Sequence, residues 1–136
     1  MSFARDNRLS IVVPGDNASV GLPFTLTWKA PELTDRFVIF FDRAPMRPNT
    51  DLLSVVAQTD PCRTRPKCPD DLWLSQNNVY VTDHTSLVVN TLPDTRQNGS
   101  SLDEHEVTIV LMDRTTGRRI GQEAWVRDFS VNRGTK

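Results

Sequence analysis

The two cysteines of the chain, Cys62 and Cys68, are separated by five residues, three of which carry a positive charge. A structural zinc site needs about four ligands, and only His84 and His105, both far along the chain, could add nitrogen ligands. A redox pair is typically C-x-x-C at the start of a helix, which is not the spacing here. The spacing favours a structural disulfide, with two free thiols as the remaining alternative. A disulfide would indicate an oxidising compartment, that is, an extracellular, periplasmic or cell-surface location.

The positive charges between the cysteines alternate along the sequence, so an extended loop would present them on one side. Such a loop would suit a polyanion, an acidic protein surface or lipid headgroups. Acidic residues flank the loop, and the alternative is an ordinary solvated loop in which the charges neutralise one another. A second basic tip follows the turn at 114–117. The candidate partner-binding residues are Arg63, Arg65, Lys67, Trp73, Arg118 and Arg119.

The three tryptophans raise a second hypothesis, carbohydrate binding. Trp28 alternates with Phe24 and Leu26 and is expected in the core. Trp125 has the opposite phase to its two neighbours and is predicted to face outward, while Trp73 lies in an irregular segment. An exposed indole beside Asp and Asn side chains would stack on a sugar ring; the alternative is that each tryptophan packs inside the protein.

Hydrolytic chemistry has little support in the sequence, and we expect no enzyme activity, no cofactor and no metal. The chain has no G-x-S-x-G and no EF-hand pattern. The stretch "DEHE" (103–106) gathers carboxylates around His105, but we interpret it as a loop that enters a strand. Asn17 and Asn98 each begin an N-glycosylation acceptor triplet in an expected loop.

These residues must be positioned by a mostly β framework, because apolar and polar residues alternate along much of the chain. The segment 36–42 is apolar on both faces, which predicts a central strand that is covered on both sides. Gly117 is expected to supply a positive φ in the turn at 114–117. The predicted strands are 9–14, 23–28, 36–42, 78–82, 85–92, 106–113 and 119–131.

Residues 43–78 interrupt this pattern and read as one long insertion between the third and fourth strands. Within it, 49–58 and 68–78 have the capping residues and apolar spacing of short helices. The expected organisation is an arm over 1–8, a single domain over 9–131 and a tail over 132–136.

Three blocks of the sequence resemble parts of a fibronectin type III module: "FTLTWKAPE", "SLVVNTLP" and "VTIVLMDRTTGRRIGQEAWVRDFSV". The resemblance implies an antiparallel sandwich of immunoglobulin or fibronectin type, with seven or eight strands and a partly helical, disulfide-clamped insertion. It also implies an extracellular spacer or recognition unit. The chain departs from the module in one respect. The module carries a tyrosine shortly after its Leu-Pro corner, whereas here residues 94–104 intervene and no tyrosine follows Tyr80.

The bulk properties fit this interpretation. The net charge of −1 over 136 residues gives no electrostatic reason to expect nucleic acid binding, and no apolar run is long enough to span a membrane. The first residues lack the apolar core of a signal peptide, and we take the chain to be a fragment of a larger protein. The leading hypothesis is a non-catalytic extracellular module that acts as a spacer or protein-interaction domain, with a protein or a cell-surface polymer as partner. The alternatives are a carbohydrate-binding module and an accessory domain of a larger enzyme.

Overall fold

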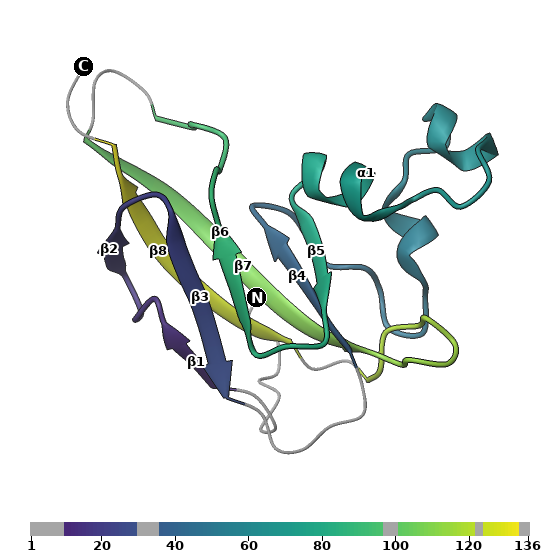
Figure 1. Ribbon diagram of the computed structural model, residues 1–136, viewed down its shortest axis with the longest axis horizontal. Helices are drawn as coiled ribbons and strands as arrows, with labels where there is room; N and C mark the ends of the chain where they lie inside the picture. The colour runs from purple at the N-terminus through teal and green to yellow at the C-terminus, as the bar shows by residue number, and fades with distance from the viewer. Residues whose placement is uncertain (1–9, 30–35, 97–100, 122–123, 134–136) are drawn as a thin grey trace.

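The computed structural model describes residues 10–29, 36–96, 101–121 and 124–133, so the arm predicted over 1–8, Asn98 and the end of the tail lie outside the described residues. Eight strands form two sheets, which confirms the all-β class (Figure 1). The strands are β1 (Ser10–Val13), β2 (Ala18–Val20), β3 (Phe24–Lys29), β4 (Arg36–Phe41), β5 (Val79–Thr82), β6 (Ser86–Val89), β7 (Leu102–Met112) and β8 (Trp125–Asn132).

The sheets have the strand orders β1-β3-β6 and β2-β8-β7-β4-β5. Every ladder is antiparallel except the one between β2 and β8, which is parallel. The parallel pair departs from the antiparallel sandwich expected from the sequence, and β2 lies between the predicted strands 9–14 and 23–28. The chain turns after β1 through an Ala18 N–H to Gly15 carbonyl bond of 3.0 Å, and Asn17 N–H donates to the Asp128 carbonyl at 2.8 Å. These bonds place β2 along the free edge of β8.

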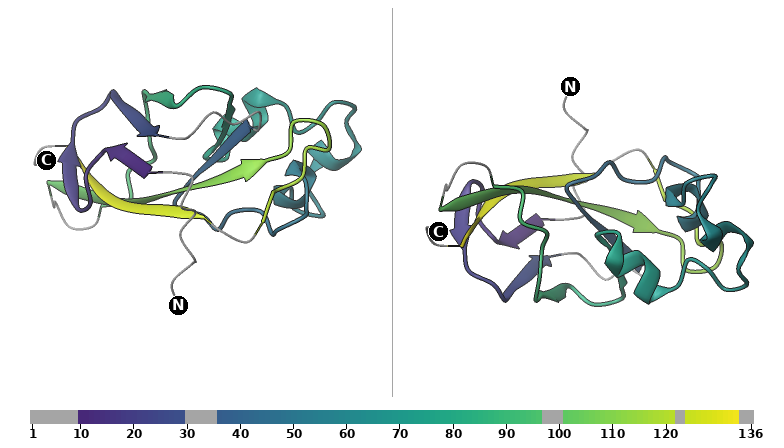
Figure 2. Two further views of the ribbon diagram at one scale, coloured as in Figure 1. Left: turned by 90° about the horizontal axis from the view of Figure 1, so that it is seen from below. Right: turned by 90° about the horizontal axis from the view of Figure 1, so that it is seen from above.

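The two sheets lie face to face, as the edge-on views of Figure 2 show, and a hydrophobic core fills the space between them. The three-stranded sheet contributes Leu26 and Trp28, and the five-stranded sheet contributes Ile39 and Ile109. All four are at most 1% exposed. The alternation that predicted these strands therefore reflects one face turned towards this inner core. We call the opposite face of the five-stranded sheet its outer face.

The insertion covers part of the outer face. It contains two 3-10 helices, η1 (Leu52–Val55) and η2 (Pro61–Thr64), and the α-helix α1 (Asp71–Gln76). Met46 and Leu74 from the insertion form a second hydrophobic cluster with the outward side chains of β4 and the second half of β7. The segment 49–58 was predicted as a helix and contains the short η1, while the Asp70 side chain caps α1 by accepting from Trp73 N–H at 2.8 Å.

Cys62 and Cys68 form the predicted disulfide, with a Cα–Cα distance of 5.4 Å. The bond joins Cys62, in η2, to Cys68, three residues before α1 begins. This part of the insertion lies at the end of the molecule beyond β4 and β5 (Figure 1). Cys62 is fully buried. The disulfide therefore clamps the insertion and joins no strand of the two sheets.

Replacing both cysteines, as in Cys62→Ala/Cys68→Ala, should lower the free energy of unfolding by about 2.4 kcal/mol, the chain-entropy value for a seven-residue ring, plus the packing lost at the buried Cys62. Urea denaturation followed by circular dichroism would measure this, with the reduced wild-type chain as the control. The far-ultraviolet spectrum of the β-sheets should persist. Loss of that spectrum in native buffer would show that the sheets depend on the clamp.

Candidate functional site

Strand β7 begins at Leu102, four residues before the predicted start at 106, so "DEHE" lies within the strand and not in a loop before it. Asp103 and His105 occupy the same alternating positions as Val107 and Ile109, which belong to the inner core. Asp103 is fully buried and His105 is 4% exposed. The strand therefore carries two ionisable side chains into the space between the sheets.

His105 lies between two carboxylates. Its Nδ1 is 2.5 Å from Asp42 Oδ2, and its Nε2 is 2.7 Å from Asp103 Oδ2. The imidazole ring stacks on Phe129, which lies directly opposite on β8, with 5.8 Å between the ring centroids. Two hydrogen bonds to carboxylates and a stacked ring fix the position of the imidazole.

Asp103 has further partners that hold it in the ionised form. Arg133 Nε donates to Asp103 Oδ2 at 2.8 Å, and both the N–H and the hydroxyl of Thr95 donate to the same carboxylate. Arg133 also donates to the Leu92 carbonyl at 2.7 Å. We call Asp42, His105, Asp103 and Arg133 the His105 network; it joins the end of β4, β7, the end of β8 and the segment after β6.

The network shifts the pKa values of its members. Burial alone would lower the pKa of His105, but hydrogen bonds and charge attraction from Asp42 and Asp103 outweigh it, so the pKa is raised. Burial would raise the pKa of Asp103, but hydrogen bonds from Thr95 and Arg133 outweigh it, so that pKa is lowered. The protonated imidazole donates from both nitrogens and has no lone pair with which to accept a proton. In this arrangement His105 acts as a structural cation.

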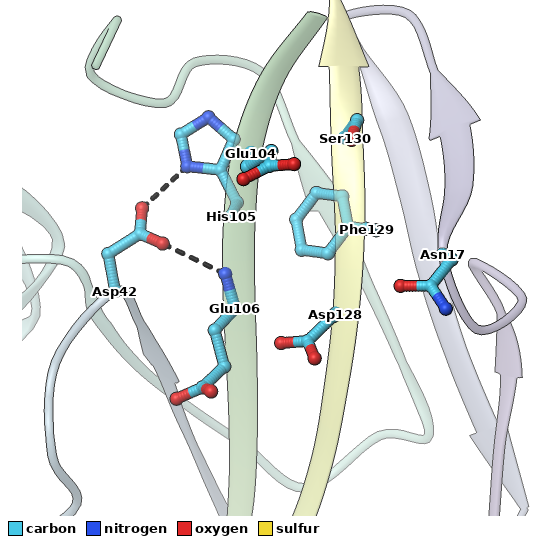
Figure 3. A pocket seen from close by; sticks show the side chains of 8 residues that line it. All are labelled: Asn17, Asp42, Glu104, His105, Glu106, Asp128, Phe129 and Ser130. Atoms are coloured by element: carbon cyan, nitrogen blue, oxygen red, sulfur yellow. Dashed lines mark hydrogen bonds and ion pairs between the residues drawn. The ribbon is translucent and has the colours of Figure 1, made fainter. Parts of the chain in front are cut away.

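An open pocket of about 530 Å³ lies beside the network (Figure 3). It is next to the part of β7 that extends past the end of β4 and pairs only with β8. Figure 3 shows Asp42 between the His105 ring and the backbone of Glu106, whose N–H donates to Asp42 Oδ1 at 2.9 Å. No Lys or Arg is among the described residues that line this pocket, and burial together with Asp128 and Asp42 raises the pKa of Glu106. The lining residues are Asn17, Asp42, Glu104, His105, Glu106, Asp128, Phe129 and Ser130.

The cations chosen from the sequence do not share one surface role. Arg63 donates to the Val56 and Leu53 carbonyls at 3.1 and 3.2 Å, so its guanidinium points into the insertion. Arg65 is exposed, with Nη2 3.4 Å from Cys68 Sγ, and Lys67 is exposed with a φ of 61°.

The two arginines of the predicted basic tip, Arg118 and Arg119, also donate to backbone carbonyls. Arg118 donates to the Asn49 carbonyl at 2.9 Å. Arg119 is 5% exposed and donates to the Met46 carbonyl at 2.8 Å. Gly117 has the expected positive φ, 70°. These two arginines attach the turn to the insertion, and the buried Arg119 offers no free surface to a partner.

Two tryptophans are half-buried. Trp73, a residue of α1, packs against the second cluster, and Trp125 packs against the inner core. The prediction that Trp125 faces outward is wrong. Its neighbour Ala124 belongs to the second cluster, so the outer face at this position is itself buried and the opposite phase leads to the inner core. Trp28 lies in the inner core as expected.

Sequence reasoning missed Asp42, Asp103 and Arg133 as partners of His105. One signal could have found part of this set, namely that Asp103 and His105 continue the spacing of the core residues of β7. Within the described ranges, no three metal-ligating side chains gather to hold a metal ion, and no helix is long and apolar enough to cross a membrane. A scan against protein-family models found no match, and searches of curated proteins and of solved structures found none either.

The contribution of His105 and Asp103 to the free energy of unfolding should be highest between about pH 4 and pH 6.5 and fall on both sides. The raised pKa of His105 gives stability that is lost as the pH rises from 6.5 through its folded-state value. The lowered pKa of Asp103 gives stability that is lost as the pH falls from 3.8 through its folded-state value. Urea denaturation across pH 3 to 9 would measure the profile.

Glu106 needs a control, because its raised pKa adds a loss of stability that begins above 4.5. The variant Glu106→Gln removes that loss and should leave the decline above pH 6.5 in place. A stability that stays level from pH 6 to 9 in this variant would contradict the charged state assigned to His105.

Proposed function

We propose that the chain is a non-catalytic, immunoglobulin-like module of a larger secreted or cell-surface protein, and that it binds a protein partner through the uncovered part of its five-stranded sheet. The alternative is an accessory domain of a larger enzyme. The disulfide supports an oxidising compartment.

The strand order supports the immunoglobulin-like assignment. In variable-type immunoglobulin domains, extra strands extend the sheet that holds the last two strands and the third. Here β8-β7-β4-β5 follows that order, and β1-β3-β6 forms the facing sheet. Immunoglobulin-type domains also use a tyrosine hydroxyl to tie the chain near the start of the penultimate strand to upstream backbone. This chain has no tyrosine after Tyr80, and a different contact closes the same end of the core: Arg133, which follows the last strand, donates to the Leu92 carbonyl with Asp103 as its counter-ion.

The state of His105 supports a non-catalytic role. A general base needs a free lone pair near its substrate, whereas both ring nitrogens of His105 face carboxylates. The side chain is also fully buried. The most perturbed histidine of the described chain thus has a structural explanation, and we assign no reaction to it.

One observation carries the proposed binding surface: the insertion covers the outer face over β4 and the second half of β7 and leaves the rest uncovered. The uncovered part, formed by β2, β8 and the first half of β7, is polar and holds the acidic pocket. Glu106 lies directly opposite Asp128, and like charges in that position destabilise a sheet. A basic side chain of a partner, reaching into the pocket, would offset this repulsion. We therefore expect a protein partner that presents Arg or Lys.

A panel of Arg- and Lys-containing peptides on an array, probed at 50 and 300 mM salt, tests this surface. The double variant Glu104→Gln/Asp128→Asn should weaken retained binding roughly tenfold, from about 0.7 kcal/mol for each exposed ion pair. Binding to the wild type should fall with salt. The matched control is Asp51→Asn/Asp71→Asn, which removes two carboxylates from the insertion. Equal binding by both double variants would contradict the pocket as the contact site.

Carbohydrate binding is favoured by one observation that does not involve the tryptophans. A second pocket of about 330 Å³ lies between the end of α1, β5 and the segment after β6. None of its described lining residues is charged. Hydroxyl and amide groups with a half-buried aromatic ring suit a neutral sugar. The pocket is lined by Ser75, Gln76, Asn78, Tyr80, Thr91, Leu92 and Pro93.

A glycan array with the variants Gln76→Ala and Tyr80→Phe tests this alternative. Any glycan that uses the pocket should lose about tenfold in retained signal with Gln76→Ala, because a sugar hydroxyl would lose its partner. The control is Trp73→Phe, which alters a side chain outside the pocket. Signal that depends on Trp73 and not on Gln76 would place sugar binding elsewhere, and no signal from any glycan would remove the hypothesis.

A further inference from the structure

The His105 network holds a charge state that a neutral imidazole cannot reproduce. A protonated ring has two N–H donors, whereas a neutral ring has one donor and one lone pair. Both ring nitrogens of His105 lie within hydrogen-bond distance of a carboxylate. After loss of one proton, one carboxylate must therefore face a lone pair in a buried site, which is unfavourable.

We propose that His105 is a pH-dependent tether, which holds the Asp42 carboxylate against β7 while the imidazole is protonated and releases that carboxylate when the imidazole becomes neutral. The Asp42 backbone stays in place in both states, because its N–H donates to the Glu106 carbonyl at 2.8 Å. The tether goes beyond the proposed function, because it concerns the free chain and needs no partner.

Asp42 is the partner that can leave. The Asp103 carboxylate is fully buried and keeps the bonds from Thr95 and Arg133 in either state of the ring. The Asp42 side chain is 25% exposed, so water can replace the lost bond. The remaining proton should thus stay on Nε2, facing Asp103. Asp42 also has a φ of 57°, an uncommon backbone conformation for aspartate that its surroundings must maintain.

Release of the Asp42 carboxylate would affect two neighbouring features, the acidic pocket and the start of the insertion. Asp42 Oδ1 accepts from the Glu106 N–H at 2.9 Å and its carboxylate forms a wall of the acidic pocket. The next residue, Arg43, donates to the Asn77 and Val55 carbonyls at 3.1 and 3.3 Å, so Asp42 also stands at the start of the insertion. The tether thus couples the charge on one buried ring to the shape of the pocket.

The charged groups around the ring determine the direction of the effect. The groups that touch it are Asp42, after β4, and Asp103, on β7. Arg133, after β8, touches Asp103, and Asp94 is 3.8 Å from Arg133. Glu104, Glu106 and Asp128 point to the outer face beside the pocket. The two carboxylates in contact with the ring favour the charged form and raise the pKa of His105 from its ordinary value of 6.5, so release occurs at a higher pH than for a free histidine.

Nuclear magnetic resonance of the isotope-labelled free chain tests the tether in two ways. The ¹⁵N shifts of His105 should show a protonated ring at pH 6 and the Nε2–H tautomer above its titration. The hydrogen-exchange protection factor of the Glu106 amide, corrected for the intrinsic pH dependence of exchange, should fall about tenfold across the same titration, because the acceptor is released. The Ile109 amide, on the same strand, serves as the internal control and should keep its protection.

The variant Asp42→Asn separates the tether from a general loosening of the fold. An asparagine oxygen can still accept from the Glu106 N–H, and its NH₂ group can donate to the Nδ1 lone pair of a neutral ring. Protection of the Glu106 amide should then stay constant with pH, and the pKa of His105 should fall.

Three results would overturn the tether, and the first two need only the wild-type chain. They are an Nδ1–H tautomer above the titration, protection of Glu106 that does not follow the titration, and the same pH-dependent loss of protection in Asp42→Asn.

Discussion

β4 and the second half of β7 are apolar on both faces, and this constraint shapes the rest of the molecule. Their inward side chains meet the three-stranded sheet, while Val38, Phe40 and Val110 point to the outer face and are fully buried there. A sheet with two apolar faces must be covered on both, and the insertion supplies the second cover. The cover reaches only β4, β5 and part of β7, so one part of the outer face is buried and the rest is exposed to solvent. The acidic pocket lies in the exposed part.

A cover without long helices or strands creates its own problem, since its carbonyl groups lack ladder partners and buried carbonyls need donors. Arginine solves this here. Four arginines donate to carbonyl groups of residues 46–77. Arg43 and Arg63 belong to the insertion, whereas Arg118 and Arg119 follow the turn after β7. One guanidinium can reach two carbonyls, which lysine does less rigidly. The excess of arginine over lysine in the sequence thus includes a structural share that composition alone does not reveal.

The sequence predicted the strands whose alternation is strong and the need to cover 36–42 on both sides, because burial and period two are linked directly. It missed β2, which has three residues and gains its place only through pairing with β8. It also missed the first half of β7, because Asp103 and His105 occupy positions where apolar residues are expected, so the apolar alternation stops at Val107. Trp125 was misplaced for a related reason: phase fixes a face only when it is known which faces are buried.

The buried charges of the His105 network follow from the way the sandwich is closed at one end. The Leu92 carbonyl near the end of the inner core accepts from Arg133, and the partly buried guanidinium has Asp103 as its counter-ion. The Asp103 carboxylate in turn accepts from Thr95 and from His105, and the second nitrogen of that ring reaches Asp42. Each member satisfies the one before it, and the two innermost members, Asp103 and His105, have fully buried side chains. The contacts that close this end of the core therefore extend from Arg133 through Asp103 and His105 to Asp42. Asp42 is the last residue of this network and also lines the acidic pocket.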